Sequence, residues 1–427
     1  MKPTRIRHWI LIAITLAAFL MYLDRACLAW MLESDSFRRD MPLEAAQKDK
    51  LKWAFFFAYA LMQVPAGWLA ERFGKRKLMT VLIALWSAFT ALAGFSTGFT
   101  LLFIARLGCG IAEAGAYPIS SSLMARWVHV NHRGFFSAIV SLGGRLGGAA
   151  APALTAQIIV ASDNWRLAGW VYGSLGLVSA WFFYTVFRET PQDHPRCNDA
   201  ERALLHEGRK AEDTVAKPAH RPFPWRATVS DGSLWWMCGM QFFTNIGWVF
   251  LINSLSGFLQ HGRHFSPSQD GWISTTALTM GLVGTLVGGL FTDACARRLG
   301  VRLGRMVPWV GTRMLAACGY LIAMQVQQPW ALALAFGLVS FSSDAGLPAT
   351  WAWASDVGGR NVAPIFGWGN MWGNFGAALQ PLIFGWVLLN HNATGDWHNA
   401  LLVGFAAYVI SGLCALGINS ARPVKGA

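Results

Sequence analysis

A small number of charged residues lie inside long apolar stretches of this chain, where charge is costly. They are Asp24 and Arg25 in the first stretch and Arg106, Glu113, Arg145 and Asp344 in later ones. A charge at the centre of a membrane-spanning helix costs roughly 2.5–3.5 kcal/mol on insertion scales, and such residues mark ion, proton or substrate pathways. Their types and positions therefore indicate a site that handles something polar or charged inside a bilayer.

The chemistry of these six residues fits an organic anion and protons. Three arginines and three acids leave the set close to neutral, and protonating two acids would make it positive. Burial away from water favours the protonated form of a carboxylate, and the planar guanidinium fork of Arg matches a substrate carboxylate. We expect Asp24 and Glu113 to bind protons, and Arg25 and Arg106 to bind the anion.

A structural role remains open for each charge. Asp24 could neutralise Arg25 or Arg106, and Glu113 could neutralise Arg145. Arg145 could instead contact the substrate, or it could pair with Asp344. Arg313, near the start of another apolar segment, could reach the membrane surface with its long side chain, so we assign it no function.

The composition predicts a helical membrane protein. Of the 427 residues, 54% are hydrophobic and 13% are charged, whereas soluble domains carry about 25% charged residues. The net charge of +13 does not indicate nucleic-acid binding, because the basic residues fall in short loops between apolar segments. The seven cysteines have no paired spacing that would indicate disulfides or a metal site. With no nucleophile–base pair and no nucleotide loop, we expect neither an enzyme nor a cofactor.

Twelve apolar segments reach the roughly 20 residues that a spanning helix needs. They cover about 8–32, 51–71, 77–97, 99–126, 134–160, 166–187, 233–260, 270–297, 305–326, 329–354, 362–388 and 397–420. A polar stretch divides them into an N-terminal six-helix bundle (1–187), a linker loop (188–232) and a C-terminal six-helix bundle (233–427). Lys and Arg gather in the linker, the two tails and alternate loops, so we expect these on the cytoplasmic side of a bacterial inner membrane.

A repeated motif follows the second and eighth segments. Each copy has a glycine, three residues, an acid and then a basic cluster, namely Gly67, Glu71, Arg72 and Arg76 in the first half and Gly289, Asp293 and Arg297 in the second. The glycine allows close helix contact, and the acid can form ion pairs with the basic residues. We expect a cytoplasmic gate here, because internal repeats are the basis of alternating access in transporters.

These motifs resemble the major facilitator superfamily, and others narrow the resemblance to its anion:cation symporter family of sugar-acid and hexuronate permeases. They are Tyr22-Leu-Asp24-Arg25, Tyr59-x-x-x-Gln63-x-Pro65-x-Gly67, Arg106-Leu-Gly-x-Gly110-x-x-Glu113, Trp351-x-x-x-x-Asp356-x-Gly-Gly-Arg360 and Asn370-Met-x-Gly373-Asn374-x-Gly376. The resemblance implies an all-α membrane fold of two pseudo-symmetric six-helix bundles. The chain departs from the family pattern at Glu71, where Asp is usual, at Arg145, and at Asn253-Ser254-Leu255.

Polar side chains could read the hydroxyl groups of a sugar acid. The candidates are Tyr59, Gln63, Gln241, Asn245, Asn253, Asn370 and Asn374, although each could serve helix–helix hydrogen bonding instead. The function that we expect is proton-coupled symport of a small organic anion, a sugar acid or other carboxylate, into the cytoplasm by a monomer. The alternative is an exchanger, such as organic phosphate against phosphate, which needs the arginines but no proton site.

Overall fold

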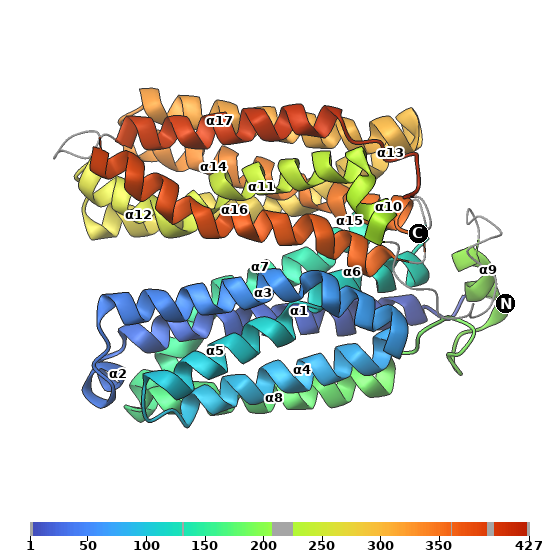
Figure 1. The fold of residues 1–427 in the computed structure, drawn as a ribbon, viewed down its shortest axis with the longest axis horizontal. Coiled ribbons are helices and arrows are strands. Elements are labelled where there is room, and N and C mark those ends of the chain that lie inside the picture. Colours follow the sequence, from blue (N-terminus) through green and yellow to red (C-terminus); the bar gives the residue numbers. More distant parts are fainter. Residues whose placement is uncertain (1–2, 130–131, 207–224, 360, 391–396, 425–427) are drawn as a thin grey trace. The chain divides into compact units, whose positions relative to one another are not determined.

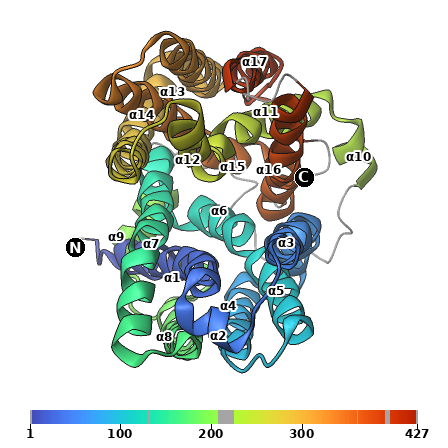
Figure 2. The same cartoon turned by 90° about the vertical axis from the view of Figure 1, so that its left-hand side faces the viewer.

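The computed structural model describes residues 3–129, 132–206, 225–359, 361–390 and 397–424, and secondary structure within these ranges is helical. The described residues divide into two compact units. The first takes in residues of Met1–Phe223 and Gly358–Gly367, and the second those of Pro224–Val357 and Trp368–Gly426. Figures 1 and 2 show the helices of both units along and across their axes.

The first unit is a bundle of long helices. Its helices are α1 (Ile6–Glu33), α2 (Asp35–Asp40), α3 (Ala45–Phe73), α4 (Lys75–Gly94), α5 (Phe99–Glu113), α6 (Ala116–Trp127), α7 (Arg133–Ser162), α8 (Trp165–Val186) and α9 (Asp199–His206). Helices α5 and α6 follow each other with a break of two residues, and together they cover the predicted fourth segment. Helices α2 and α9 are too short to cross a bilayer.

The second unit repeats this pattern. Its helices are α10 (Trp225–Ser230), α11 (Gly232–Asn253), α12 (Leu255–Gly257), the π-helical turn η3 (Phe258–Gly262), α13 (Pro267–Gln325), α14 (Pro329–Ala345), α15 (Leu347–Val357), α16 (Val362–Asn390) and α17 (Trp397–Leu416). Helix α13 has 59 residues, but Gly300 interrupts it with φ 76° and ψ 175°. Glycine tolerates this positive φ without a steric penalty, so α13 consists of two helices that meet at Gly300.

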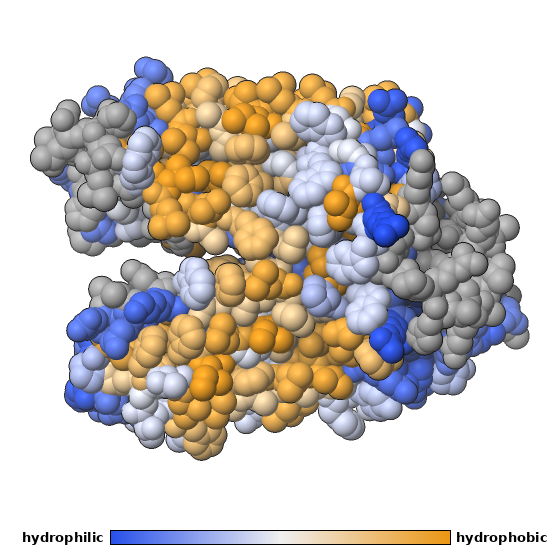
Figure 3. Space-filling view, viewed as in Figure 1, coloured by the Kyte–Doolittle hydropathy of each residue, from blue (hydrophilic) through white to orange (hydrophobic). Residues whose placement is uncertain are grey.

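The helix lengths agree with the twelve predicted segments. Eight helical stretches of the described residues are long and apolar enough to span a membrane, and one of them, Gln269–Gln325, has 57 residues and is long enough for two crossings. Helices α7, α11 and α16 also have spanning length. With α5–α6 and α14–α15 each taken as one segment, the described helices account for all twelve. Figure 3 shows apolar side chains along the helices and hydrophilic ones near their ends.

Glycines on α7 let this helix approach α1. A Cβ atom on Gly147 would lie 2.0 Å from the backbone oxygen of Phe19, and one on Gly143 would lie 2.5 Å from the side chain of Thr15. No side chain fits in either space. The glycine-rich run of the fifth segment therefore brings α7 against the helix that carries Asp24 and Arg25.

The described part of the linker contacts the beginning of α1. Glu201, on α9, is fully buried and accepts hydrogen bonds from the Thr4 hydroxyl (2.6 Å) and from the backbone amides of Ile6 (3.0 Å) and Arg7 (3.1 Å). Burial alone would raise the pKa of Glu201, but these hydrogen bonds outweigh it and hold the pKa below its usual value. A carboxylate at a helix N-terminus supplies acceptors for unpaired amides, so α9 caps α1. The remainder of the predicted linker, 207–224, lies outside the described residues.

Candidate functional site

The first unit holds an ion pair between the first and fourth predicted segments. The guanidinium of Arg25, on α1, donates two hydrogen bonds to one carboxylate oxygen of Glu113, on α5, with nitrogen–oxygen distances of 3.0 and 3.2 Å. The Glu113 side chain is 1% exposed and that of Arg25 is 17% exposed. The other oxygen of Glu113 is buried and has no hydrogen-bond partner among the described residues. One oxygen of Glu113 thus accepts two hydrogen bonds, and the hydrogen-bonding capacity of the other is unused.

Aromatic rings surround the guanidinium of Arg25. Its central carbon lies 4.8 Å from the ring centre of Tyr22, 5.0 Å from that of Phe55 and 4.6 Å from that of Tyr59. Each distance is within the range of a cation–π interaction. These rings hold the guanidinium by its faces, so its edge remains the part that can bind a carboxylate.

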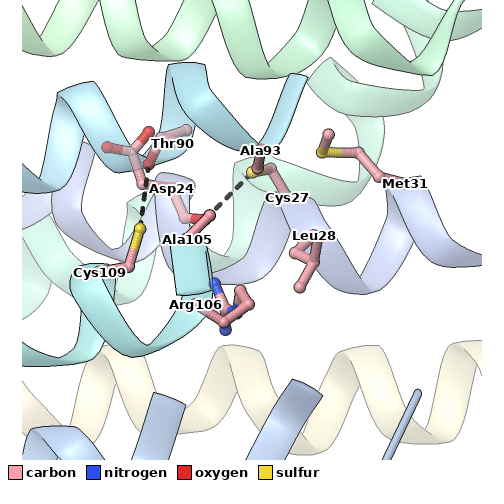
Figure 4. A pocket seen from close by; sticks show the side chains of 9 residues that line it. All are labelled: Asp24, Cys27, Leu28, Met31, Thr90, Ala93, Ala105, Arg106 and Cys109. Carbon is pink, nitrogen blue, oxygen red and sulfur yellow. Dashed lines mark hydrogen bonds between the residues drawn. The ribbon is translucent and has the colours of Figure 1, made fainter. Parts of the chain in front are cut away.

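Asp24 points away from this ion pair. Its side chain is 3% exposed, and neither carboxylate oxygen has a hydrogen-bond partner among the described residues. It lines a small pocket between α1, α4 and α5, whose lining residues are Asp24, Cys27, Leu28, Met31, Thr90, Ala93, Ala105, Arg106 and Cys109 (Figure 4). Asp24 and Arg25 are adjacent in sequence, yet the ion pair of Arg25 is with Glu113.

Arg106 lies close to both acids. It is 6% exposed, its guanidinium carbon lies 4.5 Å from the ring centre of Phe55, and its Nε has no hydrogen-bond partner within the described ranges. It interacts electrostatically with Asp24 and with Glu113. The structure therefore brings Asp24, Arg25, Arg106 and Glu113 into one cluster, as the sequence predicted, but with pairings that the sequence left open.

Arg145 takes a place beside this cluster on α7. It is half-buried and interacts electrostatically with Tyr117 of α6, whose ring meets that of Tyr22 edge-on at a centroid distance of 6.0 Å. The ion pair recorded for Glu113 is with Arg25. The structure thus does not place Glu113 in the ion pair with Arg145 that was one of the alternatives.

Two predicted polar contacts of the first unit are buried on α3. Tyr59 is 2% exposed and packs on Arg25. Gln63 is fully buried, and its side chain lies beside the hydroxyl of Tyr59.

The predicted polar residues of the second unit mostly bond within their own helices. Asn245 donates to the backbone oxygen of Gln241 on α11 at 2.9 Å, and Asn374 donates to that of Asn370 on α16 at 2.8 Å. Gln241 is 5% exposed, and Asn370 is half-buried. The side chain of Asn253 lies outside the described part of the structure.

Arg313 was interpreted as a residue that reaches the membrane surface, and the structure shows that this is wrong. It is 0% exposed. Its Nε donates to the hydroxyl of Thr244 at 2.9 Å, and one terminal nitrogen donates to Thr312 at 3.3 Å and to the backbone oxygen of Ser343 at 3.4 Å. It also interacts electrostatically with Asp344, which is 3% exposed. Arg313 therefore joins α11, α13 and α14 inside the second unit.

Glu71, one of the predicted gate residues of the first half, has polar partners on α4 and α6. Glu71 accepts from Lys75 at 2.7 Å and from Ser122 at 3.0 Å, and forms an ion pair with Arg126 at 3.8 Å. Lys75 belongs to the basic cluster of the repeated motif, so the acid is paired with this cluster, whereas Arg72 and Arg76 have other contacts. Lys75 follows Glu71 by four residues across the break between α3 and α4 at Gly74, whereas Ser122 and Arg126 reach it from α6.

The two arginines have other contacts. Arg72 lies over the ring of Trp68 at 5.4 Å. Arg76 donates to the backbone oxygen of Tyr184 at 2.6 and 3.0 Å, and its amide donates to Glu189 at 3.3 Å. Glu189 also pairs with Arg126 at 3.9 Å. Glu189 follows α8 and was missed by the motif, because it lies 113 residues from Arg76 in the chain.

The repeat in the second half has one buried and one exposed charged residue. Asp293 is 4% exposed, whereas Arg297 is exposed. The ion pair at this end of the unit joins Arg305 to Asp356, with 2.9 Å between Nε and the carboxylate oxygen. Both side chains are nearly inaccessible, at 1% and 7%. Asp356 belongs to a motif quoted above, whereas nothing in the repeat indicated Arg305.

Comparisons with known proteins place this chain in a family. Residues 14–257, more than half of the chain, match the family model described as "Major Facilitator Superfamily". A solved bacterial homologue of the human lysosomal transporter Spinster, in an inward-facing and unoccupied conformation, is 18% identical with a TM-score of 0.56, and the match covers 97% of this chain and 95% of that one. At this identity the likeness shows the fold alone.

Several curated relatives cover nearly the whole chain. "Probable sulfoacetate transporter SauU" of Cupriavidus necator is 28% identical over 97% of this chain and 94% of its own. "Probable galactarate/D-glucarate transporter GudP" of Bacillus subtilis is 26% identical over 94% and 89%. The "D-galactonate transporter" of Escherichia coli is 25% identical over 90% of each chain.

These findings agree with the helical pattern, the repeated motif and the intramembrane charges. The family and the names of these relatives are those of transporters, which are not enzymes. Among the described residues there is also no group of three or more His, Cys, Asp or Glu side chains that could hold a metal ion. The chain belongs to the major facilitator superfamily.

Proposed function

We propose that this protein carries a small organic anion, a sugar acid or other carboxylate, into the cytoplasm by symport with protons. The observation that carries the proposal is the ion pair of Arg25 with Glu113 beside the unpaired Asp24. The relatives named above are described as transporters of sulfoacetate, galactarate, D-glucarate and D-galactonate, which are all organic anions. Their names support the class of substrate.

Competition for Arg25 explains how protons and anion would be coupled. In its charged form Glu113 occupies the edge of the guanidinium, which is also the edge that a substrate carboxylate would use. A proton on Glu113 removes that competing charge and makes Arg25 available. Loss of the proton restores the ion pair and releases the substrate. Asp24 would carry a second proton, because it has no hydrogen-bonded partner to stabilise its charge.

Alternating access would move this site between the two sides of the inner membrane. The polar contacts of Glu71 in the first unit and the Arg305–Asp356 pair in the second would act as gate contacts at the cytoplasmic side. Gly67, which begins the first repeat, would allow helices to approach. We further propose that the protein works as a monomer with both termini in the cytoplasm, from the distribution of Lys and Arg.

The test uses purified protein in proteoliposomes, with labelled galactarate as the probe. We expect Asp24→Asn and Glu113→Gln to lose uphill accumulation driven by an inward proton gradient. Exchange of internal for external galactarate at equal pH should survive in at least one of them. Asp270→Asn is the matched control, since Asp270 is a buried acid (7% exposed) that bonds to Ser256, Gln260 and Ser274 in the second unit.

Two results would contradict the proposal. Normal accumulation by both variants would show that these carboxylates do not couple transport to protons. Uptake by the wild type that requires phosphate or another anion inside the vesicles, and ignores the proton gradient, would favour the exchanger. The exchanger needs Arg25 and Arg106 but neither carboxylate.

A further inference from the structure

We propose that the pocket between α1, α4 and α5 is a water site that supplies protons to Asp24 by a route separate from the substrate-binding edge of Arg25. This inference rests on the proposed proton coupling and deepens it. Asp24 faces Thr90 and Ala93 of α4 and Ala105, Arg106 and Cys109 of α5. Arg25 faces Glu113 of α5 and the rings of Phe55 and Tyr59 on α3. The side chains of these two adjacent residues thus lie on different sides of α1.

Four of the residues that line the pocket belong to α1. Asp24, Cys27, Leu28 and Met31 are spaced by three, four and seven residues, so they share one face of the helix. Seven residues extend for roughly 10 Å at the 1.5 Å rise of an α-helix. These four side chains therefore form one wall of the pocket, on the part of α1 that runs from Asp24 toward its C-terminal end, which the distribution of Lys and Arg assigns to the outer side.

Polar groups gather at the Asp24 end of the pocket. They are the two carboxylate oxygens of Asp24, the hydroxyl of Thr90 and the thiol of Cys109. Thr90 and Cys109 lie within 3.7 Å of each other. A buried water requires two to four polar partners and a space of about one probe sphere. The whole pocket is about the size of one water molecule, so a single water fills it and has these groups as its partners.

Small and apolar side chains form the other end. Figure 4 shows Asp24, Thr90 and Cys109 together at one end, and Met31 and Leu28 at the other. Ala93 and Ala105 contribute only methyl groups, and a larger side chain at either position would fill the pocket. A proton from bulk water would first bind the pocket water as a third O–H bond. The water then breaks one O–H bond as the proton binds a carboxylate oxygen of Asp24, which leaves the water neutral, and the reverse order releases the proton.

Other titratable groups near Asp24 could also contribute to the pH dependence of transport. The charged or titratable groups near Asp24 are Arg25 and Cys27 on α1, Arg106, Cys109 and Glu113 on α5, and Tyr172 on α8. The described lining residues that α4 contributes are uncharged. Changes at Thr90 or Ala93 therefore alter the pocket without removing a charge from the cluster.

The experiment compares Thr90→Val and Ala93→Leu with wild type in proteoliposomes that contain galactarate as the probe. Thr90→Val removes one hydrogen-bonding group, so we expect proton-driven uptake to slow about threefold to tenfold. Ala93→Leu should slow it further by filling the pocket. Exchange of galactarate at equal pH and the preference between galactarate and D-galactonate should stay as in wild type. Thr285→Val is the control, since that buried hydroxyl bonds to Gly281 in the second unit.

Exchange at equal pH shows that each variant folds and binds the probe, so a lost proton response cannot be attributed to unfolding. Normal proton-driven uptake in both pocket variants, together with lost coupling in Asp24→Asn, would overturn the water site and leave proton symport intact. Normal coupling in Asp24→Asn itself would overturn the proposed function. A changed preference between the two anions would show that the pocket belongs to the substrate site.

Discussion

Each unit of this protein buries an arginine in its helical core, and the two arginines have different kinds of partner. Arg25 in the first unit bonds to the carboxylate of Glu113 and lies between aromatic rings. Arg313 in the second unit bonds to two hydroxyls and a backbone oxygen, with Asp344 nearby. The Arg25 side chain is 17% exposed, whereas Arg313 is fully buried.

The difference shows which arginine can take part in exchange. A substrate anion can replace Glu113 at Arg25 once Glu113 is neutral, because one carboxylate substitutes for another. The partners of Arg313 belong to the backbone and to side chains of three packed helices, so an incoming anion would have to separate them. Buried polar networks that are mostly satisfied make a structure rigid. We therefore infer a binding role for Arg25 and a structural role for Arg313.

The sharpest test of this contrast is Arg25→Lys. Lysine keeps the positive charge but loses the guanidinium fork that holds a carboxylate. The loss of a charge-assisted hydrogen bond of about 1.5–3 kcal/mol predicts a fall in affinity of about tenfold to more than a hundredfold. Binding of galactarate to the purified protein, followed by calorimetry, measures it.

Arg166→Lys is the control for this substitution, because Arg166 also belongs to the first unit and bonds to the backbone oxygens of Gly94 and Ser96. It should bind galactarate as wild type does. Unchanged affinity in Arg25→Lys would show that Arg25 has a structural role, as Arg313 does, and does not bind the substrate.

A second test uses Arg145, which is half-buried like Arg25 and unlike the fully buried Arg313. If Arg145 contacts the substrate, Arg145→Gln should weaken uptake of the dianion galactarate by about tenfold, the loss of one charge-assisted hydrogen bond. Uptake of the monoanion D-galactonate should change little, and the pH optimum should stay in place.

In the alternative interpretation, Arg145 pairs with an acid. In that case both anions should suffer alike and the pH optimum should move. Initial rates of uptake measured with both anions across a series of pH values decide between these roles. Normal rates for both anions would exclude either one.

The smallest effect on transport is expected for Thr244→Val. Valine has nearly the shape of threonine but leaves the Nε of Arg313 without its hydroxyl partner at 2.9 Å. An unsatisfied buried group costs about 1–3 kcal/mol, so the melting temperature should fall. The Michaelis constant for galactarate should not change.

Thr285→Val is again the control, since Thr285 bonds only its own helix in the recorded contacts. Thermal unfolding in detergent together with transport kinetics measures both effects. A raised Michaelis constant with unchanged stability would show that Arg313 acts on the substrate.

Much of the fold and part of the site could be predicted from the chain alone. The length and apolar character of the segments predict the helices, because a bilayer of fixed thickness demands about 20 apolar residues. The same reasoning found Asp24, Arg25, Arg106 and Glu113, since charge within an apolar run is conspicuous. Arg313 was noticed in the same way but misinterpreted. Its distance from a segment end suggested access to the surface, while its true surroundings depend on Thr244 and Ser343 in other helices.

The pairing of charges could not be predicted, because it depends on how helices are rotated against each other. Arg25 is next to Asp24 in sequence but points along a different direction of α1, toward Glu113. Glu71 bonds to Ser122 and Arg126 of α6, and Arg76 contacts Tyr184 and Glu189, which lie more than a hundred residues away. The sequence by itself determined which charged residues lie in apolar helices. Only the tertiary structure decided which charges meet, because side-chain contacts between helices follow from packing and not from spacing along one chain.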